Sequence, residues 1–205
     1  MPRGLGHQGS MTIDVLSALA LFALITSITP GPNNLMLMAS GANFGFARTV
    51  PHMMGITLGF MVMLLLVGFG LIRVFDAFPV IYSVLKILSL IYLIYLAYKI
   101  ATAAPVQSAD PNAKPLSFLQ AAGFQWVNPK AWAFGLSIIT IYVPSAGILP
   151  LVITALVVAV MALPSVTLWT LLGGQMARFL TNPRRFRVFN VTMAALLVAS
   201  LLPAL

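Results

Sequence analysis

The stretch TPGPNNLMLMASGANFGF, residues 29–46, interrupts a chain that is otherwise mostly apolar. It follows an apolar run that would otherwise continue as one helix, and it contains Pro30, Gly31, Pro32, Asn33 and Asn34 in succession. A proline inside a helix removes a hydrogen bond and clashes with the preceding turn, which costs about 3 kcal/mol. A break so polar in a chain so hydrophobic predicts a functional site.

The composition indicates that most of the chain lies in a lipid bilayer. Of its 205 residues, 60% are hydrophobic and 7% are charged, whereas soluble domains carry about 25% charged residues. We therefore predict an all-α polytopic membrane protein with the lipid bilayer as its solvent. Cysteine is absent, which excludes disulfides and thiolate chemistry. The net charge of +8 is interpreted as a topology signal, so no nucleic-acid partner is expected.

Six segments are apolar enough to cross a bilayer, which takes about 20 residues each. They lie at about 12–30, 52–72, 79–100, 117–142, 148–172 and 187–204. Residues 1–11 are expected to be an N-terminal tail, and residues 12–205 one transporter domain. The polar linker 101–116 separates a first repeat, about 12–100, from a second, about 117–205. Because each half has an odd number of spans, we predict two inverted three-helix repeats.

The second half has a break of its own, Asn128-Pro129-Lys130, at the start of an apolar run. Interruptions at matching places in two repeats indicate a transport site. We predict that the site lies where residues 30–34 face residues 128–130. Two interpretations of Lys130 stay open: a deep residue that meets a substrate carboxylate, or a shallow residue that only sets topology.

The first break offers partners for both ends of a zwitterion. Asn33 or Asn34 is expected to cap the helix that restarts after it, with Pro32 in the first turn. The new N-terminus presents free amide groups and a partial positive charge, which suit a carboxylate. The carbonyl groups that end the preceding helix suit an ammonium group. An ordinary kink, or a loop at the membrane edge, is the alternative.

Basic residues are distributed unequally over the two predicted sides of the membrane. Arg3 and Arg73 fall on one side. The richer side has Arg48, Lys99, Lys114, Arg178, Arg184, Arg185 and Arg187. The positive-inside rule assigns the richer side to the cytoplasm, so both termini are expected to face outward.

Polar and small residues also occur in the second predicted span. His52, at its start, is expected to be a polar residue at the membrane interface. Gly55 and Gly59 are four residues apart, which is typical of a close contact between two membrane helices.

Signatures of enzymes and cofactor sites are missing from the sequence. It has no phosphate-binding glycine loop, no two carboxylates in one predicted span and no His/Asp/Glu cluster with metal spacing. We therefore expect no catalytic residue, no cofactor and no metal. Asp14, Asp76 and Asp110, the three acidic residues, fall near span ends or in a loop. A buried carboxylate is thus not expected to carry a coupling ion.

Several motifs resemble the LysE/RhtB family of bacterial amino-acid exporters. They are TPGPNNLMLMASGANFGFAR (29–48), GITLGF (55–60), YLIYLAYKIA (92–101), KPLSF (114–118) and FQWVNPKAW (124–132). The resemblance runs from about residue 12 to the C-terminus and is strongest to the cysteine/O-acetylserine exporter branch. It implies six spans and efflux of small amino acids or their derivatives across the inner (plasma) membrane. A homo-oligomer is compatible with it. A channel-like or ion-handling protein, or a non-transporting accessory subunit, are the alternatives.

Overall fold

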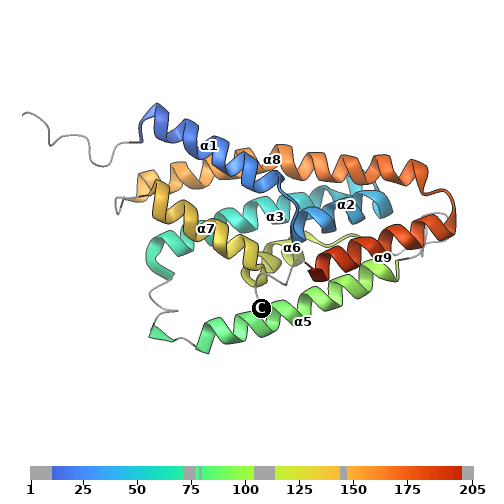
Figure 1. The fold of residues 1–205 in the computed structure, drawn as a ribbon. Helices are drawn as coiled ribbons and strands as arrows, with labels where there is room; N and C mark the ends of the chain where they lie inside the picture. The colour runs from blue at the N-terminus through green and yellow to red at the C-terminus, as the bar shows by residue number, and fades with distance from the viewer. Residues whose placement is uncertain (1–10, 72–76, 79, 104–113, 144–146, 200–205) are drawn as a thin grey trace, which may run out of the picture.

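The computed structural model describes residues 11–71, 77–78, 80–103, 114–143 and 147–199 (Figure 1). All regular secondary structure in these ranges is helical, which confirms the predicted all-α class. The elements are α1 (Ile13–Ile28), α2 (Pro32–Phe44), α3 (Phe46–Leu66), η1 (Val67–Leu71), α5 (Val80–Ala101), α6 (Phe118–Phe124), η2 (Gln125–Val127), α7 (Pro129–Tyr142), α8 (Ile148–Phe179) and α9 (Pro183–Ala199). The predicted N-terminal tail, Arg3, Arg73, Asp76, Asp110 and most of the linker 101–116 lie outside the described residues.

Three described helical segments are long and apolar enough to cross a membrane: Phe46–Leu71, Ser83–Ala101 and Ile148–Phe179. A fourth results if α1 and α2, which meet at a bend of 58°, are taken as one span. The other two predicted spans differ from a simple membrane helix for identifiable reasons. The segment 118–142 is broken before Pro129, and the 17-residue α9 begins with the basic run PRRFR. The number of six spans therefore stays a prediction.

Two helix boundaries lie outside the predicted spans. Helix α3 begins at Phe46, not near residue 52, and α8 continues to Phe179, past the predicted end at 172. Hydropathy finds only the apolar part of a helix, whereas backbone hydrogen bonding continues into polar residues such as Arg48 and Arg178. Both helices therefore extend beyond the apolar segment.

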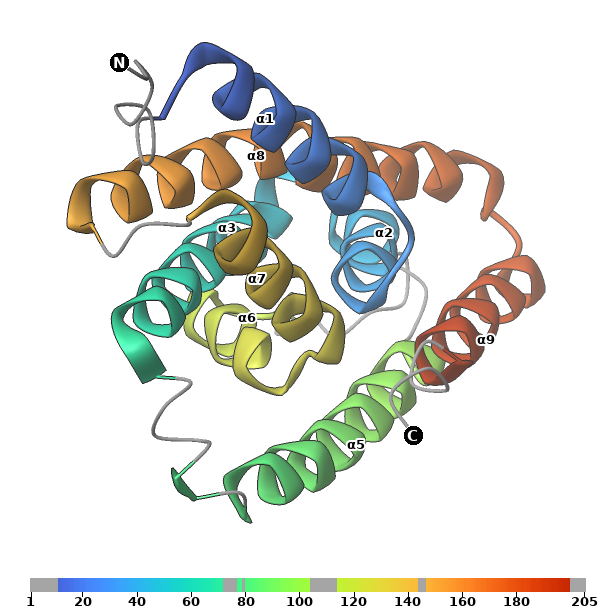
Figure 2. The same ribbon diagram turned by 60° about the vertical axis from the view of Figure 1, so that its left-hand side comes forward.

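Helix α2 is the central helix of the bundle, and ten of its 13 residues are buried (Figure 2). It packs closely on α8 because glycines bring the two backbones together. A Cβ atom at Gly41 would collide with the Thr170 carbonyl, and one at Gly173 with the Met38 carbonyl. Close approach at small residues is the usual way in which membrane helices associate.

The predicted helix contact at Gly55 and Gly59 is confirmed, and its partner is α6. A Cβ atom at Gly55 would meet the Phe118 carbonyl, and one at Gly59 would meet Ala122. The contact holds α6 against the middle of α3, next to the break that precedes α7.

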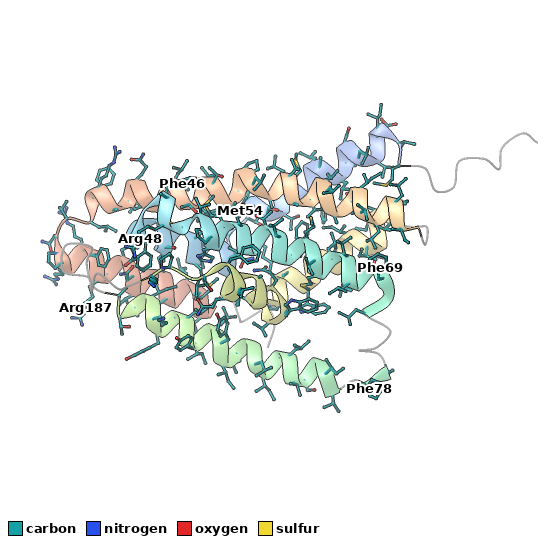
Figure 3. The ribbon with its side chains drawn as sticks, turned by 180° about the vertical axis from the view of Figure 1, so that it is seen from behind. Phe46, Arg48, Met54, Phe69, Phe78 and Arg187 are labelled. Atoms are coloured by element: carbon teal, nitrogen blue, oxygen red, sulfur yellow. The ribbon has the colours of Figure 1, made fainter. Side chains whose placement is uncertain are left out.

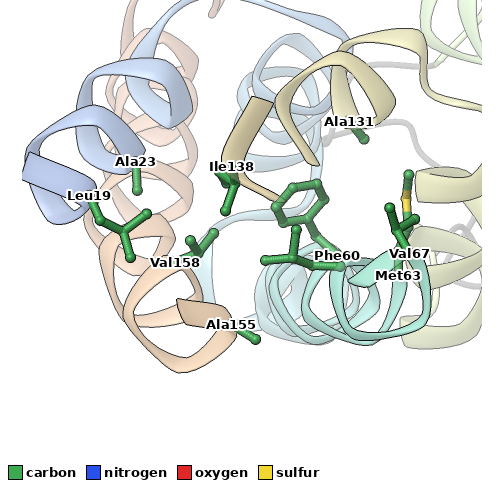
Figure 4. Packing of buried hydrophobic residues seen from close by; sticks show 10 residues of the cluster. Leu19, Ala23, Phe60, Met63, Val67, Ala131, Ile138, Ala155 and Val158 are labelled. Carbon is green, nitrogen blue, oxygen red and sulfur yellow. The ribbon is translucent and has the colours of Figure 1, made fainter. Parts of the chain in front are cut away.

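A layer of apolar side chains joins α1, α3, α7 and α8 (Figure 4). Its labelled members are Leu19, Ala23, Phe60, Met63, Val67, Ala131, Ile138, Ala155 and Val158. This layer holds α1 and α7 against α3 and α8. Helix α1 ends at the first break, and α7 begins at the second.

The outer surface is largely apolar, as expected for a protein in lipid. Large side chains such as Ile91, Leu156 and Val160 are more than half exposed. Figure 3 shows Arg48 and Arg187 at one end of the bundle and Phe69 and Phe78 at the other. The basic end also contains the C-terminal turns of α5 and α8, which carry Lys99 and Arg178. We refer to it below as the basic end.

A candidate substrate site at two helix breaks

The break between α1 and α2 spans Thr29 to Gly31 and lies near the middle of the bundle (Figure 1). Pro32 is the first residue of α2, as predicted, because a proline needs no hydrogen-bond acceptor at that position. The N-cap, however, is Gly31, and the prediction that Asn33 or Asn34 caps α2 is wrong. Both asparagines instead reach to other parts of the break. Since glycine has no side chain, the first amide groups of α2 are not covered by their cap residue.

Asn34 turns back onto the end of α1. Its Nδ2 donates to the Ser27 carbonyl at 2.7 Å and to the Thr29 carbonyl at 2.8 Å. Two further donors come from α8: Ser165 Oγ to the Ser27 carbonyl at 2.7 Å, and Trp169 Nε1 to the Ile28 carbonyl at 3.1 Å. The last carbonyl groups of a helix have no partner within it, and lipid offers none. These side chains therefore make the break tolerable inside a membrane.

The second break, before α7, is built differently. Asn128 is the N-cap of α7, and its Oδ1 accepts from the Lys130 backbone amide at 3.1 Å. Pro129 is the first helical residue, as Pro32 is in α2. Asn128 is 1% exposed, so this cap lies inside the protein. An asparagine cap before a proline is a standard helix start, which is what the motif Asn-Pro-Lys predicts.

Lys130 connects the two breaks. Its Nζ donates to the Thr29 carbonyl at 2.7 Å, to Thr29 Oγ1 at 2.9 Å and to the Pro30 carbonyl at 3.3 Å. The side chain is half-buried. The ammonium group thus lies at the break between α1 and α2, and the depth of Lys130 in the membrane stays a prediction. The carbonyl end of α1 does suit an ammonium group, and here the protein's own lysine occupies it.

Asn33 forms a second link between the halves. Its Nδ2 donates to Gln125 Oε1 at 2.9 Å, and Gln125 Nε2 donates to Asn33 Oδ1 at 3.2 Å. Gln125 Nε2 also donates to the Ala121 carbonyl at 2.9 Å, and the residue is fully buried. A reciprocal pair of amides is rigid because each side chain uses both its donor and its acceptor.

A cavity of about 70 Å³ lies between these groups. Its lining includes the polar residues Asn33, Asn34, Gln125, Asn128, Lys130 and Ser165, with Gly31, and the apolar residues Ile56, Phe60, Phe134 and Val166. Among the described residues that line it, Lys130 is the only charged one, and there is no Asp or Glu. The cavity therefore has a positive charge that a carboxylate would neutralise.

Five of the eight predicted site residues line this cavity: Gly31, Asn33, Asn34, Asn128 and Lys130. The three prolines, Pro30, Pro32 and Pro129, do not line it, and they shape the backbone instead. Gln125, Ser165 and Trp169 were missed. Gln125 had a signal in the sequence, since it is an amide in a mostly apolar run and lies three residues before Asn128. Ser165 and Trp169 had none, because only the packing of α8 on α1 brings them to the break.

No group of three or more His, Cys, Asp or Glu side chains able to hold a metal occurs among the described residues. Asp14 is exposed in the first turn of α1, away from the cavity. Outside the cavity, His52 is 1% exposed and so is buried within the protein, and its predicted position at the membrane interface stays a prediction.

A family model described as LysE type translocator matches residues 24–201. A curated protein named cysteine/O-acetylserine efflux protein, from Escherichia coli strain K12, is 32% identical over 194 residues, covering 92% of this chain and 96% of that protein. Its namesake from Salmonella typhimurium strain LT2 is 34% identical over 195 residues, with the same coverage. No solved structure matches the chain.

Proposed function

Since this chain belongs to the LysE family of translocators, we propose that it exports small amino acids or their derivatives from the bacterial cytoplasm across the inner membrane. A translocator moves a solute without changing its covalent bonds, so the chain is not an enzyme. The resemblance stated from the sequence motifs is confirmed by the family match. The names of the relatives favour cysteine and O-acetylserine as the substrates to test first.

One observation carries the proposal for the site: the Lys130 ammonium group lies at the carbonyl end of α1, beside the uncapped start of α2. A zwitterion needs an anion site and a cation site a few ångströms apart. Here the anion site is made by Lys130 and the amide groups at the start of α2. The cation site is made by the carbonyls of Thr29 and Pro30.

The two sites explain how the protein avoids an unpaired charge when no substrate is bound. Without substrate, Lys130 fills the cation site itself. We propose that a substrate carboxylate draws the lysine away from Thr29 and Pro30, and that the substrate ammonium then takes its place. Each charge would keep a partner throughout, which matters because an unpaired charge in a low-dielectric interior is costly. A ligand with only one of the two charged groups should bind poorly.

The size of the cavity supports a closed state in this structure. Its volume of about 70 Å³ is below the roughly 150 Å³ of an engineered cavity that accepts benzene. A small amino acid therefore needs the cavity to widen before it is bound. The bend between α1 and α2 is the natural place for such a movement, since the backbone there is held by side chains rather than by helical hydrogen bonds.

We further propose six spans in two inverted repeats. In support of this, each half begins with a broken helix, α1–α2 in one and α6–α7 in the other, and each break restarts at a proline. The two breaks contact each other through Lys130 and through the Asn33–Gln125 pair. The gathering of basic residues at one end supports the assignment of that end to the cytoplasm.

The test is efflux from proteoliposomes that contain only the purified protein, preloaded with a panel of labelled amino acids including cysteine and O-acetylserine. Two glycine variants give a matched pair. A Cβ atom at Gly31 would lie 2.7 Å from Cδ of Lys130, whereas one at Gly123 would have no neighbour within 4 Å. Gly31→Ala should displace the flexible lysine and slow efflux with folding intact, and Gly123→Ala should transport like the unmodified protein.

Three results would contradict the proposal. A current without saturable flux of any amino acid would indicate a channel. The absence of flux from a correctly folded, reconstituted protein would indicate an accessory subunit. Equal flux in Gly31→Ala and Gly123→Ala would remove the break from the substrate path.

A further inference from the structure

A second cavity, of about 100 Å³, lies nearer the basic end and shares no lining residue with the first. It is bounded by α2, α3, α5 and the segment before α6, and its polar lining residues are Ser40, Asn43, His52, Lys99 and Lys114. The two cavities follow each other along α3. His52 lines the second, and Ile56, one helical turn and about 6 Å further on, lines the first.

His52 forms part of this cavity and is the most unusual residue in it. The side chain is 1% exposed, and within the described chain neither ring nitrogen has a hydrogen-bond partner. An imidazole has at least one N–H group, and a buried donor without an acceptor costs about 1–3 kcal/mol. Native structures seldom keep such a group unless a ligand or water completes it.

The other buried polar side chains of the cavity already have partners. Asn43 Nδ2 donates to the Ala39 carbonyl at 2.6 Å and to Asn190 Oδ1 at 3.2 Å. Thr49 uses its hydroxyl proton on the Gly45 carbonyl at 2.8 Å, so in the 2.9 Å contact between Ser40 and Thr49 the donor must be Ser40. His52 is thus the buried group left to contact a ligand.

The charges around the cavity specify the sign of that ligand. Lys99 on α5 and Lys114 before α6 line it and are exposed, while α2 and α3 contribute no charged side chain to the lining. Among the described residues that line it there is no Asp or Glu. Two lysines at an exposed edge and an imidazole donor in the interior attract an anion and then hydrogen-bond it.

We propose that this cavity is a loading site, in which His52, Lys99 and Lys114 bind the carboxylate of the amino acid at the cytoplasmic side before it moves one turn along α3 to the break. The inference rests on the proposed export function for the identity of the ligand. The volume of about 100 Å³ is larger than the volume of about 70 Å³ of the first cavity. The phosphate of an anionic lipid has similar chemistry, so the test must separate the two sources.

The chain has two histidines, His7 and His52, so a His7→Gln background leaves one imidazole to observe. The protein, labelled with ¹⁵N-histidine, is placed in nanodiscs of phosphatidylcholine and titrated with propionate, which has a carboxylate and no amine. The His52 signal should shift saturably. In a Lys99→Gln, Lys114→Gln double variant the apparent affinity should fall roughly tenfold, since two exposed charge pairs are lost. In Lys130→Met, which alters only the first cavity, the shift should persist.

Three outcomes would overturn the loading site. The first is no shift with propionate, and the second is equal affinity in the double lysine variant. The third is a shift produced by phosphatidylglycerol nanodiscs that propionate cannot displace, which would assign the cavity to a lipid phosphate. Efflux of O-acetylserine is measured on the same variants reconstituted in proteoliposomes. Efflux without a His52 response overturns the loading site alone, whereas a His52 response in a protein that exports no amino acid overturns the proposed function.

Discussion

The hydrogen bonds at the end of α1 allow us to predict how much side chains at the break contribute to the free energy of unfolding. Asn34→Ala removes two neutral hydrogen bonds, to the carbonyls of Ser27 and Thr29. At about 0.5–1.5 kcal/mol each, the free energy of unfolding should fall by about 1–3 kcal/mol. Ser165→Ala removes one, to the same Ser27 carbonyl, so its loss should be about 0.5–1.5 kcal/mol.

The Asn34→Ala, Ser165→Ala double variant tests the role of these hydrogen bonds more directly than either single variant. In Asn34→Ala or Ser165→Ala alone, the Ser27 carbonyl keeps one donor, but in the double variant it loses both. The combined loss should therefore exceed the sum of the single losses by about 1 kcal/mol, within the range seen for groups that share a partner. Ser137→Ala is the control, because its hydroxyl only bonds the Ala133 carbonyl on an exposed face, and it should change stability by less than about 0.5 kcal/mol.

The assay is reversible unfolding in mixed micelles, followed by tryptophan fluorescence, and efflux is measured on the same variants in proteoliposomes. Asn34→Ala should also lose efflux while it still reaches the membrane, because the end of α1 is no longer held. Strictly additive losses in the double variant, or unchanged efflux in Asn34→Ala, would refute this reasoning about the break.

Three further predictions concern packing, the site and topology. Gly173→Ala should prevent stable folding because its Cβ atom would collide with the α2 backbone, whereas Gly174→Ala, with its nearest atom at 3.9 Å, should fold; thermal unfolding distinguishes them. Gln125→Leu should abolish efflux and keep most of the protein folded, because it leaves the Asn33 amide without its partner; normal flux would exclude this pair from the site. In this cysteine-free chain, Thr12→Cys should react with an impermeant reagent added outside cells and Asn182→Cys should not; the reverse pattern would invert the proposed orientation.

The sequence predicted the breaks well because their chemistry is local. Prolines and asparagines in an apolar run have few uses, and the helix starts at Pro32 and Pro129 depend on neighbouring residues alone. The family resemblance, whose motifs include both breaks, was likewise sufficient to identify a translocator.

What the sequence could not provide was contact between distant residues. Whether Lys130 is deep or shallow depends on where α7 starts relative to α1, and the residues in contact are about a hundred positions apart. The role of Asn34 was misjudged for a related reason. Local rules favour an asparagine cap, whose Oδ1 would accept from one backbone amide, but by reaching back to α1 the Asn34 Nδ2 donates to two carbonyl groups.

The burial of His52 is another feature that the sequence alone did not predict. A histidine at the start of an apolar segment is expected at an interface, but the sequence did not predict its burial within the protein, because α3 begins six residues earlier and places it inside the bundle. The helix boundary, not the residue type, determined its burial.

The central claim is that Lys130 at the paired breaks binds the substrate carboxylate, and the most direct test is equilibrium binding of labelled O-acetylserine to the purified protein. Lys130→Met keeps most of the side-chain volume without the charge, and the loss of one charge-assisted contact should weaken binding roughly 10- to 100-fold. Lys130→Arg should also weaken it, because the planar guanidinium cannot occupy the position of the ammonium. Lys86→Met, a lysine on the exposed side of α5, controls for charge alone and should bind normally. Affinity in a folded Lys130→Met variant equal to that of the unmodified protein would contradict the claim.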